Sequence, residues 1–136
     1  MSDTLSTEVY WLALTLFMTA IMWVPYILNR LVEQGVFNAL WDPRGVTATR
    51  NAWAERMMRA HENAVENLVV FAPLVLLIES TQLNSPLTAT ACMVYFFARL
   101  AHFLVFTFGV PVLRVLTFAV GFGVQMILLA RLFLVL

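Results

Sequence analysis

Four long stretches of the chain carry almost no charge, and this pattern limits the possible folds more than any other feature. The first stretch, Val9 to Leu28, has 20 residues and no charged side chain. That is the length a helix needs to cross the hydrocarbon core of a bilayer, and aromatic side chains lie near both of its ends, as is common at membrane surfaces. The pattern predicts four transmembrane helices, over about residues 9–28, 61–79, 87–108 and 112–136.

The composition argues against a water-soluble fold. Of the 136 residues, 62% are hydrophobic and 12% are charged, and a chain of this length has too much surface to bury so many apolar side chains. We therefore expect a single all-α membrane domain over residues 1–136, a bundle of four transmembrane helices in contact with the lipid bilayer. The formal net charge is zero and no basic run is present, so no nucleic-acid partner is expected.

The single cysteine gives no indication of a metal centre. One cysteine can form neither an intrachain disulfide nor a thiolate cluster, and Cys92 lies in an apolar run. We expect Cys92 to serve in packing and expect no metal site.

The connection between the first two spans, about residues 29–53, is predicted to be a polar loop with a turn at Trp41 to Gly45. It leads into a helix that starts near Asn51 and extends beyond the bilayer. Five arginines lie between Asn29 and Ala60, so the positive-inside rule places this connection in the cytoplasm and both termini on the opposite side. Arg131 runs against this count, and we expect its side chain to reach the outer membrane surface.

Ionisable side chains inside a membrane span are costly, so their positions point to function. Arg59, Asn63 and Glu66 are spaced by four and three residues, which puts them on one face of the second spanning helix. The same spacing relates four residues of the third span: Tyr95, Arg99, His102 and Phe106.

The topology brings these polar groups to one side of the membrane. The second helix enters from the cytoplasm, the third ends there and the fourth begins there, so a cavity open to the cytoplasmic surface is predicted. Arg114, in the first turn of the fourth helix, opposes the helix dipole, and a bound anion would offset that cost.

Structural explanations remain open for each of these residues. Glu66 and Arg99 can form a purely structural ion pair between helices. His102 can be a core histidine with its hydrogen bonds satisfied. Asn63 can bind a neighbouring helix.

Three segments together resemble one known family. The segment RAHENAVEN over residues 59–67, the segment YFFARLAH over residues 95–102, and Pro111 with Arg114 follow one another as in the MAPEG family, the membrane-associated proteins in eicosanoid and glutathione metabolism. The resemblance covers nearly the whole chain in order and spacing, and it suggests a small prokaryotic-type member.

The resemblance implies a homotrimer in a bacterial inner membrane, with glutathione as cosubstrate bound between subunits at the cytoplasmic end. The implied activity is that of a transferase or peroxidase acting on hydrophobic electrophiles or lipid hydroperoxides. Arg114 would be the catalytic residue, because a free thiol with a pKa of about 8.5 needs a nearby cation to become a thiolate at neutral pH. The implied glutathione-binding residues are Arg30, Arg59, Asn63, Glu66, Arg99 and His102.

The chain departs from the family pattern at two positions. Phe106 stands where several relatives have a tyrosine that contacts glutathione, and Val115 follows Arg114 where prostaglandin E synthase has a serine. Glu62 adds a negative charge near the expected site of an anionic peptide.

Two other functions remain alternatives to the enzyme. A small multidrug-type transporter needs a carboxylate near the middle of the first span, which has none after Glu8. A non-catalytic membrane subunit of the same fold is the third hypothesis.

Overall fold

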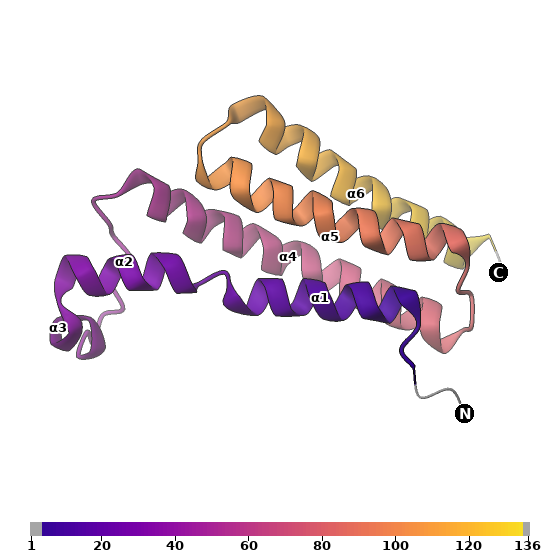
Figure 1. Ribbon diagram of the computed structural model, residues 1–136, viewed down its shortest axis with the longest axis horizontal. Helices are drawn as coiled ribbons and strands as arrows, with labels where there is room; N and C mark the ends of the chain where they lie inside the picture. Colours follow the sequence, from indigo (N-terminus) through magenta and orange to yellow (C-terminus); the bar gives the residue numbers. More distant parts are fainter. Residues whose placement is uncertain (1–3, 135–136) are drawn as a thin grey trace.

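The computed structural model describes residues 4–134, and these form six α-helices and no strand. Four segments are long and apolar enough to cross a membrane, and the first of them consists of α1 and α2 together, Thr7–Gln34. The chain is thus an all-helical, multi-pass membrane protein, as the sequence predicts (Figure 1). The helices are α1 (Thr7–Ile21), α2 (Val24–Gln34), α3 (Val36–Leu40), α4 (Ala52–Ser80), α5 (Pro86–Thr107) and α6 (Pro111–Phe133).

Three of the predicted spans agree closely with observed helices. The predicted second span forms part of α4, whose 29 residues include the expected extension that begins after Asn51. The predicted third span lies within one residue of α5 at each end. The predicted fourth span corresponds to α6, although its last two residues, 135 and 136, lie outside the described residues.

The first span differs from the prediction because it is broken. α1 ends at Ile21 and α2 begins at Val24, with Pro25 in the first turn of α2, where its missing N–H leaves no helical hydrogen bond unmade. α2 continues to Gln34, so the predicted loop over residues 29–53 begins six residues later and also contains α3.

The polar residues of this region form one face of a helix. Asn29 and Glu33 are one turn apart on α2, and both bind Thr49 and Asn51 of the segment that leads into α4. The sequence suggested a loop because the polar residues of α2 bind a segment about 20 residues further along the chain, and this contact cannot be seen in the local pattern.

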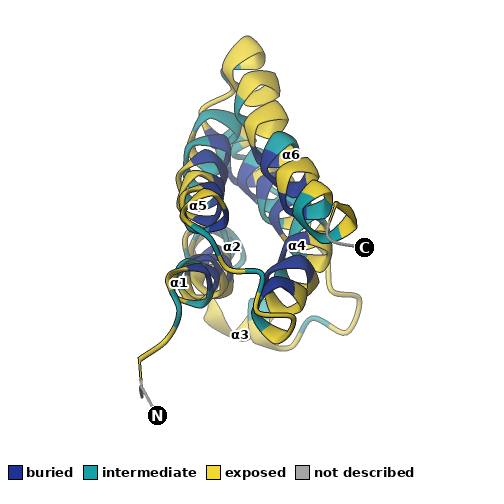
Figure 2. Ribbon diagram, turned by 90° about the vertical axis from the view of Figure 1, so that its right-hand side faces the viewer, coloured by how far each residue is buried: buried dark blue, intermediate teal, exposed yellow. Residues whose placement is uncertain are grey.

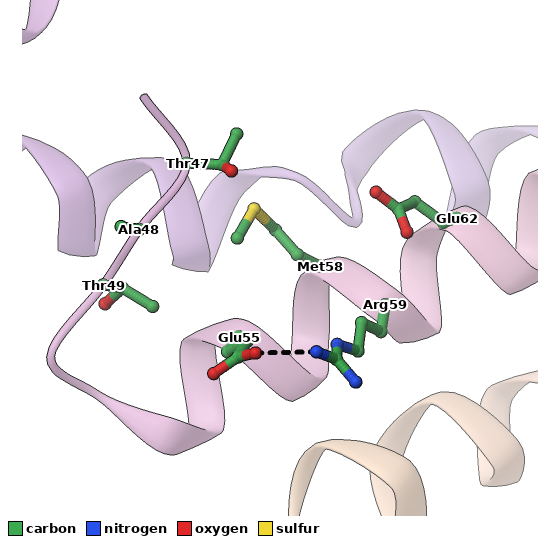
Figure 3. Close-up of a pocket in the computed structure, with 7 residues that line it drawn as sticks. All are labelled: Thr47, Ala48, Thr49, Glu55, Met58, Arg59 and Glu62. Carbon is green, nitrogen blue, oxygen red and sulfur yellow. Dashed lines mark hydrogen bonds and ion pairs between the residues drawn. The ribbon is translucent and has the colours of Figure 1, made fainter. Parts of the chain in front are cut away.

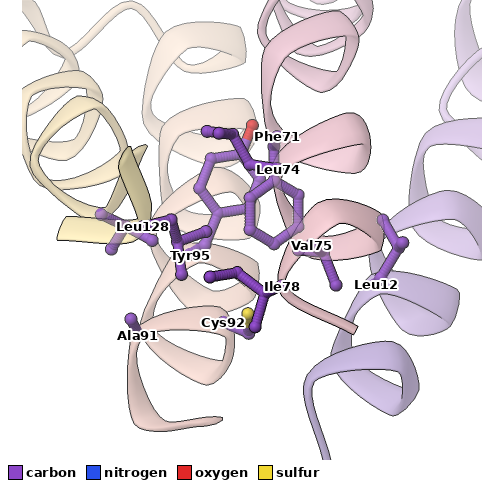
Figure 4. Close-up of a cluster of buried hydrophobic side chains, with 10 residues drawn as sticks. Leu12, Phe71, Leu74, Val75, Ile78, Ala91, Cys92, Tyr95 and Leu128 are labelled. Carbon is purple, nitrogen blue, oxygen red and sulfur yellow. The ribbon is translucent and has the colours of Figure 1, made fainter. Parts of the chain in front are cut away.

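The core lies between α1, α4, α5 and α6. The rings of Phe71 and Tyr95 stack with centroids 3.7 Å apart and planes 12° apart (Figure 4). Cys92, which is 0% exposed, packs in the same cluster, as expected. The packing of α4 against α5 therefore depends on aromatic contact across the two helices.

A polar cluster ties the start of α1 to the start of α5. Ser85 and Thr88 form a capping box at the start of α5. The buried carboxylate of Glu8 accepts hydrogen bonds from the Thr88 hydroxyl and the Ser85 main-chain N–H. These bonds explain why a carboxylate can be buried at the end of a membrane span.

One face of α4 is exposed along its whole length. Exposed residues dominate the outer faces of the bundle and the start of α6 (Figure 2). On α4 they recur at spacings of four and three, so they lie on one side of the helix. This exposed stripe of α4 consists of Glu55, Arg59, Glu62, Glu66, Val69, Pro73, Leu76 and Ser80.

Candidate functional site

The start of α4, the end of α5 and the start of α6 meet at one end of the bundle. Asn63 on α4 contacts Arg99 on α5, and the ring of His102 on α5 contacts the main-chain carbonyl of Arg114 on α6. The three predicted polar groups therefore lie at the same end of the molecule, which is the arrangement the sequence predicts.

Three adjoining pockets follow α4 at this end. The first, of about 350 Å³, lies between α4 and the segment of residues 47–49 that precedes it (Figure 3). Arg59 lines it and donates a hydrogen bond of 2.8 Å from Nη2 to Glu55 Oε1, although both side chains are well exposed. This ion pair leaves most of the Arg59 guanidinium open to the pocket.

The second pocket, of about 240 Å³, is lined by Arg30 and Tyr26 of α2. The Arg30 guanidinium is already paired with the carboxylate of Asp42. The third pocket, of about 420 Å³, is lined by Tyr26 and Glu66. Glu62 lines all three pockets, so the pockets that Arg30, Arg59 and Glu66 line are neighbours along α4.

Asn63 and Arg99 are not among the residues that line these three pockets. Arg99 is 2% exposed, and its Nη2 donates a hydrogen bond of 2.6 Å to Asn63 Oδ1. No ion pair joins Arg99 to Glu66 within residues 4–134, so the structural pair that the sequence left open is not formed in the described chain.

His102 is likewise buried, at 3% exposed. Its Nδ1 lies 3.0 Å from the carbonyl oxygen of Arg114 and 3.2 Å from Oγ1 of Thr117. Because a carbonyl oxygen can only accept, Nδ1 carries the proton, and His102 holds the first turn of α6 in place.

Arg114 is not brought into the pockets of its own chain. It is exposed, and its guanidinium carbon lies 5.4 Å from the centroid of the Phe106 ring. Within one chain, the pocket residues on α2 and α4 are therefore separate from Arg114 on α6. Asn63, Arg99 and His102 connect α4, α5 and α6.

Two contacts made by the pocket residues were not predicted from the sequence. The Tyr26 hydroxyl and His61 Nδ1 share a hydrogen bond of 2.7 Å across the third pocket. His61 lies inside the motif of residues 59–67, but nothing in the sequence indicates that Tyr26 is its partner.

The ion pair between Arg30 and Asp42 is the second such contact. Main-chain N–H groups of Val46 and Arg44, together with the Arg30 guanidinium, hold the pKa of Asp42 below its usual range. Asp42 is therefore ionised at neutral pH and keeps Arg30 engaged. The turn at Trp41 to Gly45 was recognised in the sequence, but its side-chain partner was not.

The fold and this end of the bundle define a class: a small four-span membrane protein with cationic side chains gathered at one end of its helices. The chain belongs to the MAPEG family, whose sequence model matches residues 9–134. No curated protein and no solved structure matches the chain.

Proposed function

We propose that this MAPEG protein is a glutathione-dependent transferase or peroxidase that acts on hydrophobic electrophiles or lipid hydroperoxides. The family includes enzymes of both kinds. The observation that carries the proposal is the group of neighbouring pockets lined by Arg30, Arg59 and Glu66, at the end of the bundle where Arg114 lies in the first turn of α6.

The charges of these residues complement those of glutathione, which has two carboxylates and one ammonium group. Arg30 and Arg59 would bind carboxylates, for which the guanidinium fork is suited. Glu66 would accept from the ammonium group. Arg114, near the free N–H groups of the first turn of α6, would favour the thiolate, which is the nucleophile.

A second copy of the chain would complete the site. Glu66 lies 14 residues from the end of α4, about 21 Å along the helix, so the exposed stripe of α4 carries charge into the hydrocarbon core. A charged side chain facing lipid there is costly, and a polar partner surface removes that cost. We propose that copies pack along this stripe as a homotrimer, and that Arg114 of one copy faces the pockets of the next.

The location of the arginines supports an orientation. The end that carries the pockets also carries five arginines: Arg30, Arg44, Arg50, Arg56 and Arg59. We propose that this end faces the cytoplasm and that the termini lie on the opposite side. The protein would then lie in the inner membrane of a bacterial cell. Glutathione would arrive from water and the apolar electrophile from the lipid.

Thermal unfolding of the detergent-purified protein with glutathione is the first test. A ligand that binds only the folded state raises Tm, and the rise continues with the logarithm of ligand concentration above Kd, so we expect Tm to increase steadily with added glutathione. Absence of any rise in Tm across the glutathione titration would contradict glutathione binding.

Conjugation of 1-chloro-2,4-dinitrobenzene tests the activity. Removing one group that stabilises developing negative charge typically lowers turnover by about 10²- to 10³-fold, so we expect a loss of that order in Arg114→Ala. Cys92→Ala is the matched control and should conjugate normally. Glutathione binding without turnover on any electrophile would instead support a non-catalytic subunit.

A further inference from the structure

An apolar groove lies between α4 and α6, at the end of the bundle where α4 ends and α5 begins. Its volume of about 480 Å³ exceeds that of each of the three pockets at the other end. Hydrophobic side chains of both helices form its walls, among them Leu74 and Leu77 of α4 and Leu129, Leu132 and Phe133 of α6. The groove has the size of a small-molecule pocket but almost no hydrogen-bonding group, so it suits a hydrocarbon chain.

The groove opens toward the surroundings of the bundle. Leu77 is 49% exposed and Phe133 is 67% exposed, whereas Leu74 is 5% exposed. Leu74 lies six residues, about 9 Å, from the end of α4 at Ser80, so the groove extends from the end of the helix into one leaflet of the bilayer. The acyl chains of membrane lipids occupy this depth.

A cation is fixed beside this groove. Arg131 of α6 donates a hydrogen bond of 3.2 Å from Nε to the main-chain carbonyl of Leu83, and the Leu83 side chain lines the groove. The other guanidinium nitrogens make no hydrogen bond to any of residues 4–134, and no carboxylate among these residues lies within 4.0 Å of them. The guanidinium is therefore held by one nitrogen and keeps donors for an anion.

The described acids at this end of the bundle are already bound. Glu8 accepts hydrogen bonds from the start of α5, and Glu79 accepts them from the hydroxyl of Ser6 and the amide of Asn84. The last four residues of the exposed stripe of α4 carry no charge, so a second copy packed along that stripe would bring no anion to Arg131. An anion for Arg131 must therefore come from outside the described chain.

We propose that this groove binds a phospholipid of the surrounding leaflet, with an acyl chain between α4 and α6 and the phosphodiester on Arg131. The guanidinium fork matches phosphate oxygens, and the end of a spanning helix lies at the depth of the lipid headgroups. The site also accounts for an arginine that runs against the positive-inside count, because this arginine holds a lipid. It is separate from the pockets near Arg59 and does not depend on glutathione binding.

Three ligands separate the two parts of the site. Dioleoylphosphatidylglycerol carries chains and phosphate, dioleoylglycerol carries the chains alone, and glycerol 3-phosphate carries the phosphate alone. Titration of each into the detergent-purified protein, followed by thermal unfolding, ranks their affinities. We expect the strongest stabilisation from the phospholipid, less from dioleoylglycerol and none from glycerol 3-phosphate. Equal stabilisation by glycerol 3-phosphate would indicate a site for free phosphate and would overturn the proposal.

Substitutions on the two sides of the site complete the test. Arg131→Gln should lower the affinity for the phospholipid about fivefold or more and leave that for dioleoylglycerol unchanged, because only the phosphate contact is lost. Arg131→Lys should restore the preference for the phospholipid. Leu77→Trp, at a half-exposed lining residue, fills the groove and should weaken binding of both lipids. Arg44→Gln, the same change at an exposed arginine far from the groove, is the matched control and should alter neither affinity.

Two other results would overturn the proposal. If Arg131→Gln keeps the full preference for the phospholipid over dioleoylglycerol, Arg131 serves only to bind the carbonyl of Leu83. If the wild-type protein binds neither lipid and Leu77→Trp lowers the mass of the protein in detergent, measured by light scattering, a second copy of the chain occupies the groove.

Discussion

The guanidinium of Arg56 donates a hydrogen bond of 2.8 Å from Nε to the main-chain carbonyl of Thr107, and so ties the start of α4 to the last turn of α5. The carbonyl groups at the end of a helix lack helical partners, and a cation there also interacts favourably with the helix dipole. Gly109, in the turn that follows, has a φ of +74° and lies against the same guanidinium. The turn that leads to Arg114 is therefore held by α4.

Gly109→Ala should destabilise the protein. A left-handed conformation costs an L-residue about 1–2 kcal/mol, and the added Cβ would lie 3.2 Å from Arg56 Nε, so the ion must shift as well. Thermal unfolding in detergent measures the change in Tm. Gly45→Ala is the control, since its φ of +60° carries the same conformational cost but its surroundings are open. An equal loss in both variants would contradict a role for the Arg56 contact.

Gly121→Leu should be more damaging than Gly123→Leu. A side chain at Gly121 meets Arg99 and Tyr95, and overpacking of this kind typically costs about 1–3 kcal/mol. Among residues 4–134, no atom lies within 4 Å of a Cβ added at Gly123. Unfolding midpoints of the two variants, measured side by side, test the difference, and similar midpoints would show that α6 does not approach α5 as described.

Phe71→Ala should be among the most destabilising single changes. The ring is 0% exposed and stacks on Tyr95, and removal of a buried phenylalanine typically costs about 3–5 kcal/mol. Phe108→Ala, at a ring that is 74% exposed, is the matched control and should be nearly neutral. Denaturation of both variants, followed by tryptophan fluorescence, provides the measurement.

The loop around Asp42 should open in acid. Its pKa lies below the ordinary value of 3.8 in the folded chain, so its contribution to stability is complete above pH 3.8 and is lost as pH falls through the folded pKa. Hydrogen exchange at the main-chain N–H groups of Arg44 and Val46 should rise in that range. Asp42→Asn should show fast exchange already at neutral pH and no such transition.

Much of the architecture could be predicted because hydropathy and helix length are local properties. The extension of α4 beyond the membrane was visible in the polar residues that follow Asn51, and α5 was visible in the apolar run that begins near Leu87. The break after Ile21 was not predicted, since Pro25 is compatible with both a mild kink and a new helix. The structure divides the span there.

The site was predicted at the level of helix faces but not of contacts. Spacing placed Asn63 and Glu66 on one face of α4, yet it could not decide which of them Arg99 binds. Nor could it reveal that Arg30 is paired with Asp42, because that contact depends on how the loop folds back onto α2. Both questions concern distances between elements, and no local pattern encodes them.

The four spans have unequal lengths, and this difference affects how a ligand can reach the end of the bundle that carries the pockets. Thr7–Gln34 and α4 extend over 28 and 29 residues, about 42 to 44 Å, whereas α5 and α6 have 22 and 23, about 33 to 35 Å. The helices end at similar levels near Ser80 and Pro86, so the excess projects at the other end (Figure 1). A hydrocarbon layer about 30 Å thick leaves these extra turns among the lipid headgroups. A hydrophilic molecule can then approach from bulk solvent while an apolar one diffuses laterally to the same depth.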